Sequence, residues 1–169
     1  MDRRGEIKKS ANKLEKQLAD YLGGWRIPAS GSIDCMKGDI DWGNYLIDSK
    51  NTEKSTIPLL AKDLGKIFKE GREADKTGHL ILSFLEEDYH WAVVPKVDCD
   101  FESYEQTVLA NKSKSISKSL LATLERKSFK AGKIPSIKVH FKNMLLGVPR
   151  VWLILPLKNY KNIFGVDNE

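Results

Sequence analysis

The sequence has few of the residues that soft metal sites and disulfide-rich folds require. Its 169 residues include two cysteines, Cys35 and Cys99, which do not have the paired spacing of a zinc site. The three histidines, His79, His90 and His140, are scattered along the chain. A zinc centre and a histidine-activated nucleophile therefore have little support.

Long apolar runs are also missing. No run approaches the roughly 20 residues that span a bilayer, and the first residues lack the apolar segment of a secretion signal. The apolar fraction of 41% and the charged fraction of 30% are typical of soluble globular proteins. We therefore expect a single domain over residues 1–169, no membrane association and reduced thiols. The expected location is the cytoplasm, or the host cytoplasm if a phage encodes the chain.

Acidic side chains are scarce in one part of the chain. Residues 112–142 hold nine lysines and arginines against one acid, Glu125, whereas residues 1–111 hold more acids than bases. This charge separation is expected if acids hold a metal ion and bases hold a polyanion. The competing interpretation is a solvated basic face.

Two short strands joined by a turn around Gly43 carry the clearest functional pattern. Side chains alternate along a strand, so Asp48 and Lys50 in the predicted strand 45–51 share one face. Asp39, on the preceding strand, comes alongside them. Two carboxylates without a nearby histidine or thiolate form a hard oxygen site that suits Mg²⁺ or Mn²⁺. The ordinary alternative for an Asp-x-Lys pattern is a solvated face or a surface ion pair.

Such a site has the chemistry of phosphodiester hydrolysis. A divalent ion held there activates water and neutralises charge on a phosphate under attack. Lys50 can stabilise the developing charge or orient the attacking water. Asp34 and Asp41 also lie nearby in the sequence, so Asp39 is the preferred one of three candidates.

Two flanking features strengthen this interpretation. Residues 25–32 combine the start of a strand with a proline-restricted turn and a Ser-Gly-Ser loop, whose hydroxyls and amides suit phosphate. Glu15 lies at the border of the apolar stripe of a predicted helix over residues 6–22, from where it can reach a site beside the sheet. More often such a glutamate points to water or pairs with a lysine such as Lys8.

The order of these parts is helix acid, Arg-x-Pro-x-Ser-Gly, Gly-Asp and hydrophobic-Asp-x-Lys. With this order, residues 5–95 resemble the PD-(D/E)xK nuclease superfamily, and most closely the archaeal and phage-type Holliday junction resolvases. The chain departs from the family pattern at Gly38, where a proline is usual. The resemblance implies an α/β fold with a restriction-endonuclease-like core, in which helices flank a mixed central β-sheet.

The resemblance also implies roles for individual residues. Lys50 is the expected catalytic lysine, and the expected metal ligands are Glu15, Asp39, Asp48 and the backbone carbonyl of Ser49. Glu6 is the weaker alternative to Glu15. DNA-backbone contacts are expected from Arg26 and Ser30. From the charge pattern we also expect phosphate contacts from Lys112, Lys114 and Lys118, in a Lys/Ser-rich loop over residues 112–119. The competing interpretation of this loop is a flexible linker.

The function implied is a Mg²⁺-dependent DNA endonuclease that hydrolyses phosphodiester bonds in branched DNA and acts as a homodimer. The apolar strand near Val151 or the helix over residues 120–129 would supply the dimer interface. The alternatives are a restriction-type or single-strand-specific nuclease, or a DNA-binding recombination subunit without catalysis.

The remaining elements follow from periodicity and turn residues. Residues 1–95 form the expected catalytic core, and residues 96–169 a basic extension of the same domain. Beyond the elements named above, we expect a helix capped by Ser55 or Thr56 that runs to about residue 74, with Pro58 in its first turn, strands over 79–85, 89–94, 137–141 and 151–155, and short helices over 101–110 and 158–164.

Overall fold

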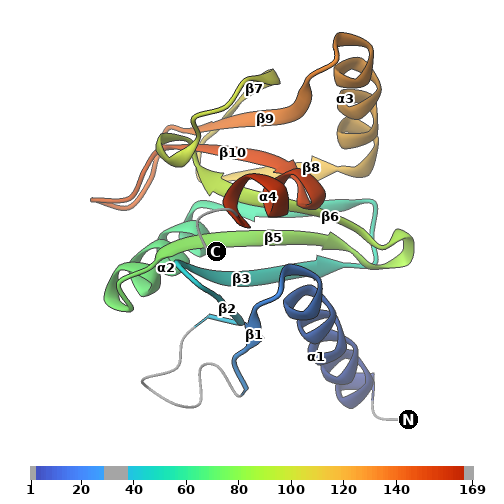
Figure 1. Cartoon of the computed structure of the whole chain (residues 1–169), viewed down its shortest axis with the longest axis vertical. Coiled ribbons are helices and arrows are strands. Elements are labelled where there is room, and N and C mark those ends of the chain that lie inside the picture. Colours follow the sequence, from blue (N-terminus) through green and yellow to red (C-terminus); the bar gives the residue numbers. More distant parts are fainter. Residues whose placement is uncertain (1–2, 29–37, 166–169) are drawn as a thin grey trace.

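A mixed sheet of eight strands runs through the chain and carries helices on both faces (Figure 1). This computed structural model describes residues 3–28 and 38–165. In sheet order the strands are β1 (Trp25–Arg26), β2 (Ile40–Trp42), β3 (Tyr45–Thr52), β5 (Thr77–Phe84), β6 (Tyr89–Pro95), β10 (Val151–Pro156), β9 (Ile134–Phe141) and β7 (Ser103–Ala110). A separate ribbon pairs β4 (Thr56–Leu60) with β8 (Ser113–Ser117). The helices are α1 (Arg3–Leu22), α2 (Ala61–Glu73), α3 (Lys118–Ala131) and α4 (Leu157–Phe164), with short turns η1 (Leu85–Glu87) and η2 (Lys96–Asp98).

Two helical crossovers make the sheet mixed. Strands β3 and β5 pair in parallel and are joined through α2, and β7 and β9 pair in parallel and are joined through α3. The other neighbouring strands of the sheet are antiparallel. Parallel neighbours need a crossover connection, so these two helices are fixed against the sheet by topology as well as by packing.

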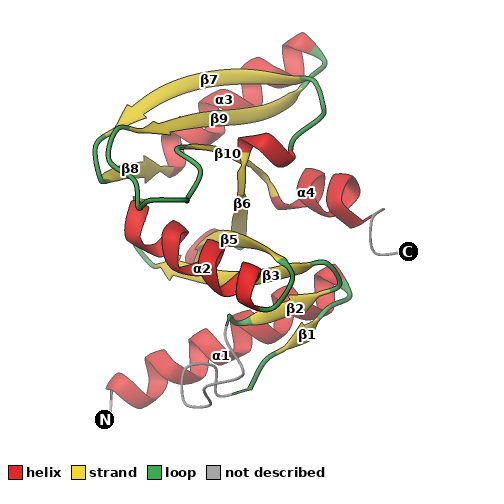
Figure 2. Cartoon of the chain, turned by 90° about the vertical axis from the view of Figure 1, so that its left-hand side faces the viewer, coloured by secondary structure: helices red, strands yellow, loops and turns green. Residues whose placement is uncertain are grey.

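The helices form a layer on each face of the sheet, as the view in Figure 2 shows. Helices α1 and α4 bury their leucines and aromatic residues with one face of β2, β3, β6 and β10. Helices α2 and α3 and the β4–β8 ribbon pack against the other face. The expected α/β class with a mixed central sheet flanked by helices is confirmed. Within the described residues, none of the helices has the length and apolar character needed to cross a bilayer.

Most of the predicted elements are present, with ends shifted by a few residues. The first helix, the hairpin around Gly43, the two strands after α2 and the helix that follows β8 are all found. The last strand and the last helix are confirmed as β10 and α4. These elements have strong apolar periodicity or a clear turn residue at an end.

The expected helix over residues 101–110 is wrong, because this segment is strand β7. Its residues alternate, with Tyr104, Val108 and Ala110 packed toward the core and Glu105 and Leu109 exposed. That is a period of two, in a segment that also contains β-favouring Thr, Val and Tyr.

The expected Lys/Ser loop and the expected helix start near Ser55 are also wrong, because both segments form strands. Residues 113–117 and 56–60 pair with each other as an antiparallel ribbon, and α2 begins only at Ala61. Ile57 and Ile116 pair across the ribbon and are almost fully buried. Leu59 of β4 is fully buried as well, so three apolar side chains attach this ribbon to the core.

The dimer interface expected near Val151 is wrong. Strand β10 lies inside the sheet, hydrogen-bonded to β6 on one side and β9 on the other. Its central residues, from Trp152 to Leu155, are fully buried. A second copy cannot reach them without opening the sheet. The alternative surface, on α3, stays a prediction.

Candidate active site

The backbone around Asp39 places its carboxylate at the free edge of β3. The Asp39 N–H donates to the Ile47 carbonyl and its own carbonyl accepts from the Ile27 N–H, both at 2.8 Å. Beyond Ile47, β2 no longer covers that edge of β3. The Ser49 N–H there donates instead to Asp39 Oδ2, at 2.8 Å. The carboxylate is thus held by the main chain of the neighbouring strand.

Gly38 explains why proline does not precede this acid. Its φ of +76° lies in the left-handed region, and a Cβ there would approach the Leu46 side chain to 2.7 Å. A proline ring holds φ near about −65°, so proline does not fit this backbone. Gly38 therefore lets the chain turn so that Asp39 reaches β3.

Asp39 and Asp48 form a close carboxyl pair. Burial raises the pKa of Asp48 to about 7, with further raising contributions from a hydrogen bond and the charge of Asp39. The Asp48 side chain is only 13% exposed. Two carboxylates in this position repel each other when both are ionised, and a cation between them relieves that repulsion.

Lys50 lies on the same face as Asp48, as the strand alternation predicts. Its Nζ is 3.4 Å from Asp48 Oδ2. Burial by itself lowers the pKa of Lys50, but the charges of Asp48, Asp63 and Asp39 outweigh it, so the pKa is raised. The ammonium therefore stays charged beside the carboxyl pair.

Helix α2 adds two residues that the sequence analysis did not assign to the site. Asp63 raises the pKa of Lys50, and Lys66 lowers the pKa of Asp48, both through charge. In helical projection Lys66 falls on the polar side of α2, which by itself indicates only a solvated face. Neither residue has a local sequence signal, because only the parallel crossover from β3 to β5 brings α2 over the strand.

Glu15 has a different partner in this structure. Arg26 Nε lies 3.1 Å from Glu15 Oε2, and Arg26 Nη2 donates to Asn12 Oδ1 at 2.8 Å. Within the described residues, no three His, Cys, Asp or Glu side chains form a group that could hold a metal ion. Glu15 as a ligand and Arg26 as a phosphate contact stay predictions that require this ion pair to open.

The other candidates fall into two groups. Ser30 and Asp34 lie outside the described residues. Asp41, the remaining alternative to Asp39, is bound by Lys76 Nζ at 2.5 Å. Of the two candidates that the structure describes, Asp39 is the one that interacts with Asp48.

The three predicted DNA-binding lysines do not share one loop. Lys112 is exposed just before β8, and Lys114 is half-buried on that strand. Lys118 begins α3, and its Nζ lies 2.7 Å from Glu87 Oε1. Among the three, Lys112 has the most open surroundings for a phosphate.

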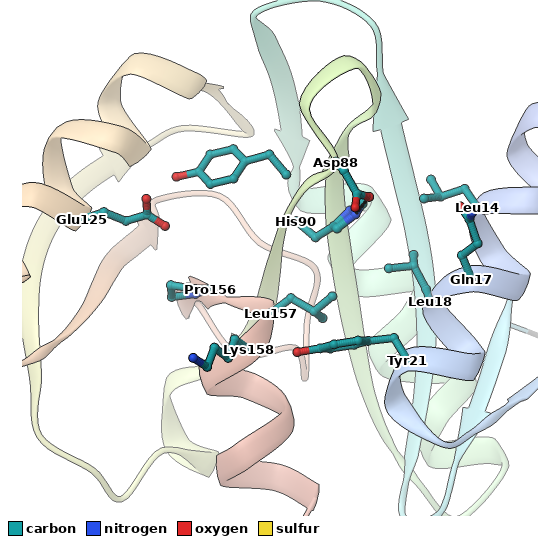
Figure 3. A pocket seen from close by; sticks show the side chains of 11 residues that line it. Leu14, Gln17, Leu18, Tyr21, Asp88, His90, Glu125, Pro156, Leu157 and Lys158 are labelled. Carbon is teal, nitrogen blue, oxygen red and sulfur yellow. Dashed lines mark hydrogen bonds and ion pairs between the residues drawn. The ribbon is translucent and has the colours of Figure 1, made fainter.

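A second polar region lines a cavity of about 480 Å³ between α1, α3, α4 and the start of β6 (Figure 3). His90 there contacts Ser83 Oγ at 2.8 Å and Asp88 Oδ1 at 2.7 Å. Ser83 is fully buried, so it cannot serve as a nucleophile despite this serine–histidine–aspartate contact. The lining carboxylates of Asp88 and Glu125 outnumber the one lysine, Lys158, which disfavours a phosphate ligand.

Comparison of the chain with models of known families, with curated proteins and with solved structures gives no match. The case for a function therefore depends on the carboxyl pair and its surroundings.

Proposed function

We propose that the protein is a Mg²⁺-dependent DNA endonuclease. The observation that carries this proposal is the contact between the carboxyl groups of Asp39 and Asp48 beside the Lys50 ammonium. A raised pKa at a paired carboxyl group is a common property of functional sites, because a purely structural role gains nothing from the repulsion.

The residues present fit a hard divalent ion. Mg²⁺ is commonly held by one or two protein carboxylates, with waters and substrate phosphates completing its shell. Asp39 and Asp48 supply the carboxylates. The N–H and carbonyl of one strand residue point to the same side, so the Ser49 carbonyl shares the edge where Asp39 lies. A bound ion would supply charge neutralisation and an acidified water.

The chain's own groups then have distinct roles. Asp39 and Asp48 hold the ion against β3, and Lys50 donates hydrogen bonds to the attacking water or to the phosphate oxygen that gains charge. Lys66, from α2, adds positive charge above Asp48 and favours its ionised form. Asp48 and Lys50 come from β3 and Lys66 from α2, while Asp39, just before β2, is held by hydrogen bonds to β3.

The order of elements supports the finer fold assignment. Helix α1, strands β1 to β4, the crossover helix α2 and the parallel strand β5 follow one another in the chain, with β4 outside the main sheet. We infer from this order, with the motif resemblance, that this part is a restriction-endonuclease-like core. Branched DNA as the substrate and a homodimer as the active form belong to the same proposal.

A cleavage assay tests the proposal. Matched four-way junction, flap, single-strand and duplex DNA are incubated with the protein in Mg²⁺ and in EDTA. We expect Mg²⁺-dependent cutting, strongest on the junction, and its loss in Asp48→Asn. The exposed Asp20 on α1 provides a matched control, and Asp20→Asn should cut as the wild type does. Equal cutting by Asp48→Asn would falsify the site, and binding without any cutting would favour the non-catalytic alternative.

A further inference from the structure

The connection between β9 and β10, residues 142–150, is a firmly anchored turn. At its first end, the Lys142 N–H donates to the Ala110 carbonyl at 2.8 Å and the Asn143 N–H donates to the Asn111 carbonyl at 3.1 Å. At its second end, Trp152 Nε1 donates to the Pro149 carbonyl at 2.8 Å. This connection is called the β9–β10 loop below.

The tip of the loop is also fixed. The Val148 N–H donates to the Leu145 carbonyl at 3.2 Å, and the Val148 side chain is buried. Gly147, with φ +78°, turns the chain in the left-handed region. Between these contacts, the Leu146 side chain is 98% exposed. The loop therefore presents a large apolar side chain to solvent on a backbone that is held on both sides.

The loop lies against the helix that serves the candidate active site. A Cβ on Gly65 of α2 would come within 2.5 Å of Leu145 Cδ1, so the Leu145 side chain packs directly on the helix at this glycine. Gly65 stands between Asp63 and Lys66, the two α2 residues whose charges act on Lys50 and Asp48. In both views of the fold the loop lies beside the first turns of α2 (Figures 1 and 2).

Basic residues stand at both ends of the loop and in the cavity beside it. Lys142 and Arg150 are exposed at the two ends of the loop, and residues 142–150 include no acid. Lys62 and Lys112 line a cavity of about 480 Å³ that the loop shares with the start of α2. A polyanion is the partner that this combination of charges favours, because an apolar protein surface would gain nothing from four cations.

We propose that the β9–β10 loop is a wedge that inserts Leu146 between stacked bases at the branch point of the DNA. Leucine is one of the side chains that separate base steps in this way, while lysines and arginines hold the flanking phosphates. A branch point lowers the unstacking cost, so the wedge would select branched over continuous duplex DNA. The wedge rests on the proposed nuclease function, to which it adds the part of the chain that recognises the substrate.

The test uses a four-way junction with 2-aminopurine at the branch point, in EDTA so that no cleavage occurs. Unstacking of this base increases its fluorescence. We expect the wild-type protein to raise the signal several-fold and Leu146→Ser to lose most of that rise. Val97, which is 80% exposed on η2, provides the matched control, and Val97→Ser should behave as the wild type. Thermal unfolding verifies that both variants are folded.

The outcomes separate the wedge from the nuclease proposal. The wedge is overturned if the wild type binds the junction without a rise in fluorescence. It is also overturned if Leu146→Ser raises the fluorescence as much as the wild type does. Either result would assign the loop to a protein partner instead. Cleavage in Mg²⁺ is scored independently. A protein that raises the signal but never cuts refutes the nuclease and keeps the wedge. If the protein cuts DNA but Leu146→Ser gives the same fluorescence rise as the wild type, the nuclease proposal is kept and the wedge is refuted.

Discussion

At the scale of single residues, Asp39, Asp48 and Lys50 meet at one edge of β3. Strand alternation and one tight turn place all three there. Lys66 cannot be assigned in this way, because its proximity to Asp48 depends on a crossover and not on spacing. The partner of Glu15 is Arg26, which strand β1 supplies, and no local pattern predicts that pair.

The carboxyl pair is expected to lower the stability of the metal-free protein and to permit stabilisation by Mg²⁺. Replacing Asp48 by Asn removes the repulsion from Asp39, so we expect the free energy of unfolding at pH 8 in EDTA to rise by about 1–3 kcal/mol. Mg²⁺ should raise the melting temperature of the wild type and not of the variant. Thermal unfolding with and without Mg²⁺ measures both effects. A variant that is stabilised by Mg²⁺ as much as the wild type would remove Asp48 from the ligand set.

His79 predicts how stability depends on pH. Its ring is fully buried, stacks on Tyr45 and contacts Tyr160 Oη at 2.8 Å. Burial lowers the pKa of His79, and a hydrogen bond and the charge of Asp98 offset this only in part. The unfolded chain takes up a proton near pH 6.5 that the folded chain resists, so stability falls as the pH drops below that value. We expect the loss between about pH 7 and pH 5 to shrink in His79→Gln, measured by urea unfolding. An equal loss in both proteins would assign the pH dependence to other groups.

At the scale of elements, the errors have one cause. The segments expected as a helix over residues 101–110 and as a loop over residues 112–119 contain strands β7 and β8, whose buried positions alternate. Helices with a continuous apolar stripe and strands with long apolar runs are predicted correctly. Edge strands and short ribbons carry fewer apolar residues, so their burial is settled by partners far away in the sequence.

Close packing of α2 on β5 predicts a sensitive position. A Cβ on Gly78 would lie 2.1 Å from the Ile67 carbonyl oxygen, and that oxygen belongs to the helix backbone. We expect Gly78→Ala to destabilise the protein by about 2 kcal/mol or more, because the helix must move away from the strand. Since α2 carries Lys66, cleavage should fall as well. Unfolding in urea and the junction assay measure the two effects, and a fully stable variant would contradict the packing.

At the scale of the whole molecule, the basic charge is shared between the two parts of the sequence. Lys62 comes from α2, whereas Lys112, Lys142 and Arg150 come from the part after residue 96, and all four are exposed. Strands of both parts pair in the eight-stranded sheet and also in the β4–β8 ribbon. The fold thus brings these four basic residues, which lie far apart in the sequence, to the surroundings of α2.

This arrangement predicts the salt dependence of DNA binding. Removing one phosphate contact reduces the slope of log affinity against log salt by about 0.9. We expect the double variant Lys62→Gln with Lys112→Gln to reduce it by roughly twice that amount. Lys118→Gln should change it little, because Lys118 is paired with Glu87. Fluorescence anisotropy over a range of salt concentrations measures the slope, and the opposite ranking would place the DNA over the start of α3.

The location of a divalent ion tests the central claim most directly. A crystal soaked in Mn²⁺ should show an anomalous peak between Asp39 and Asp48, about 2.1 Å from one oxygen of each. A well-ordered crystal in which the ion binds elsewhere, with these two carboxyl groups free of metal, would contradict the account.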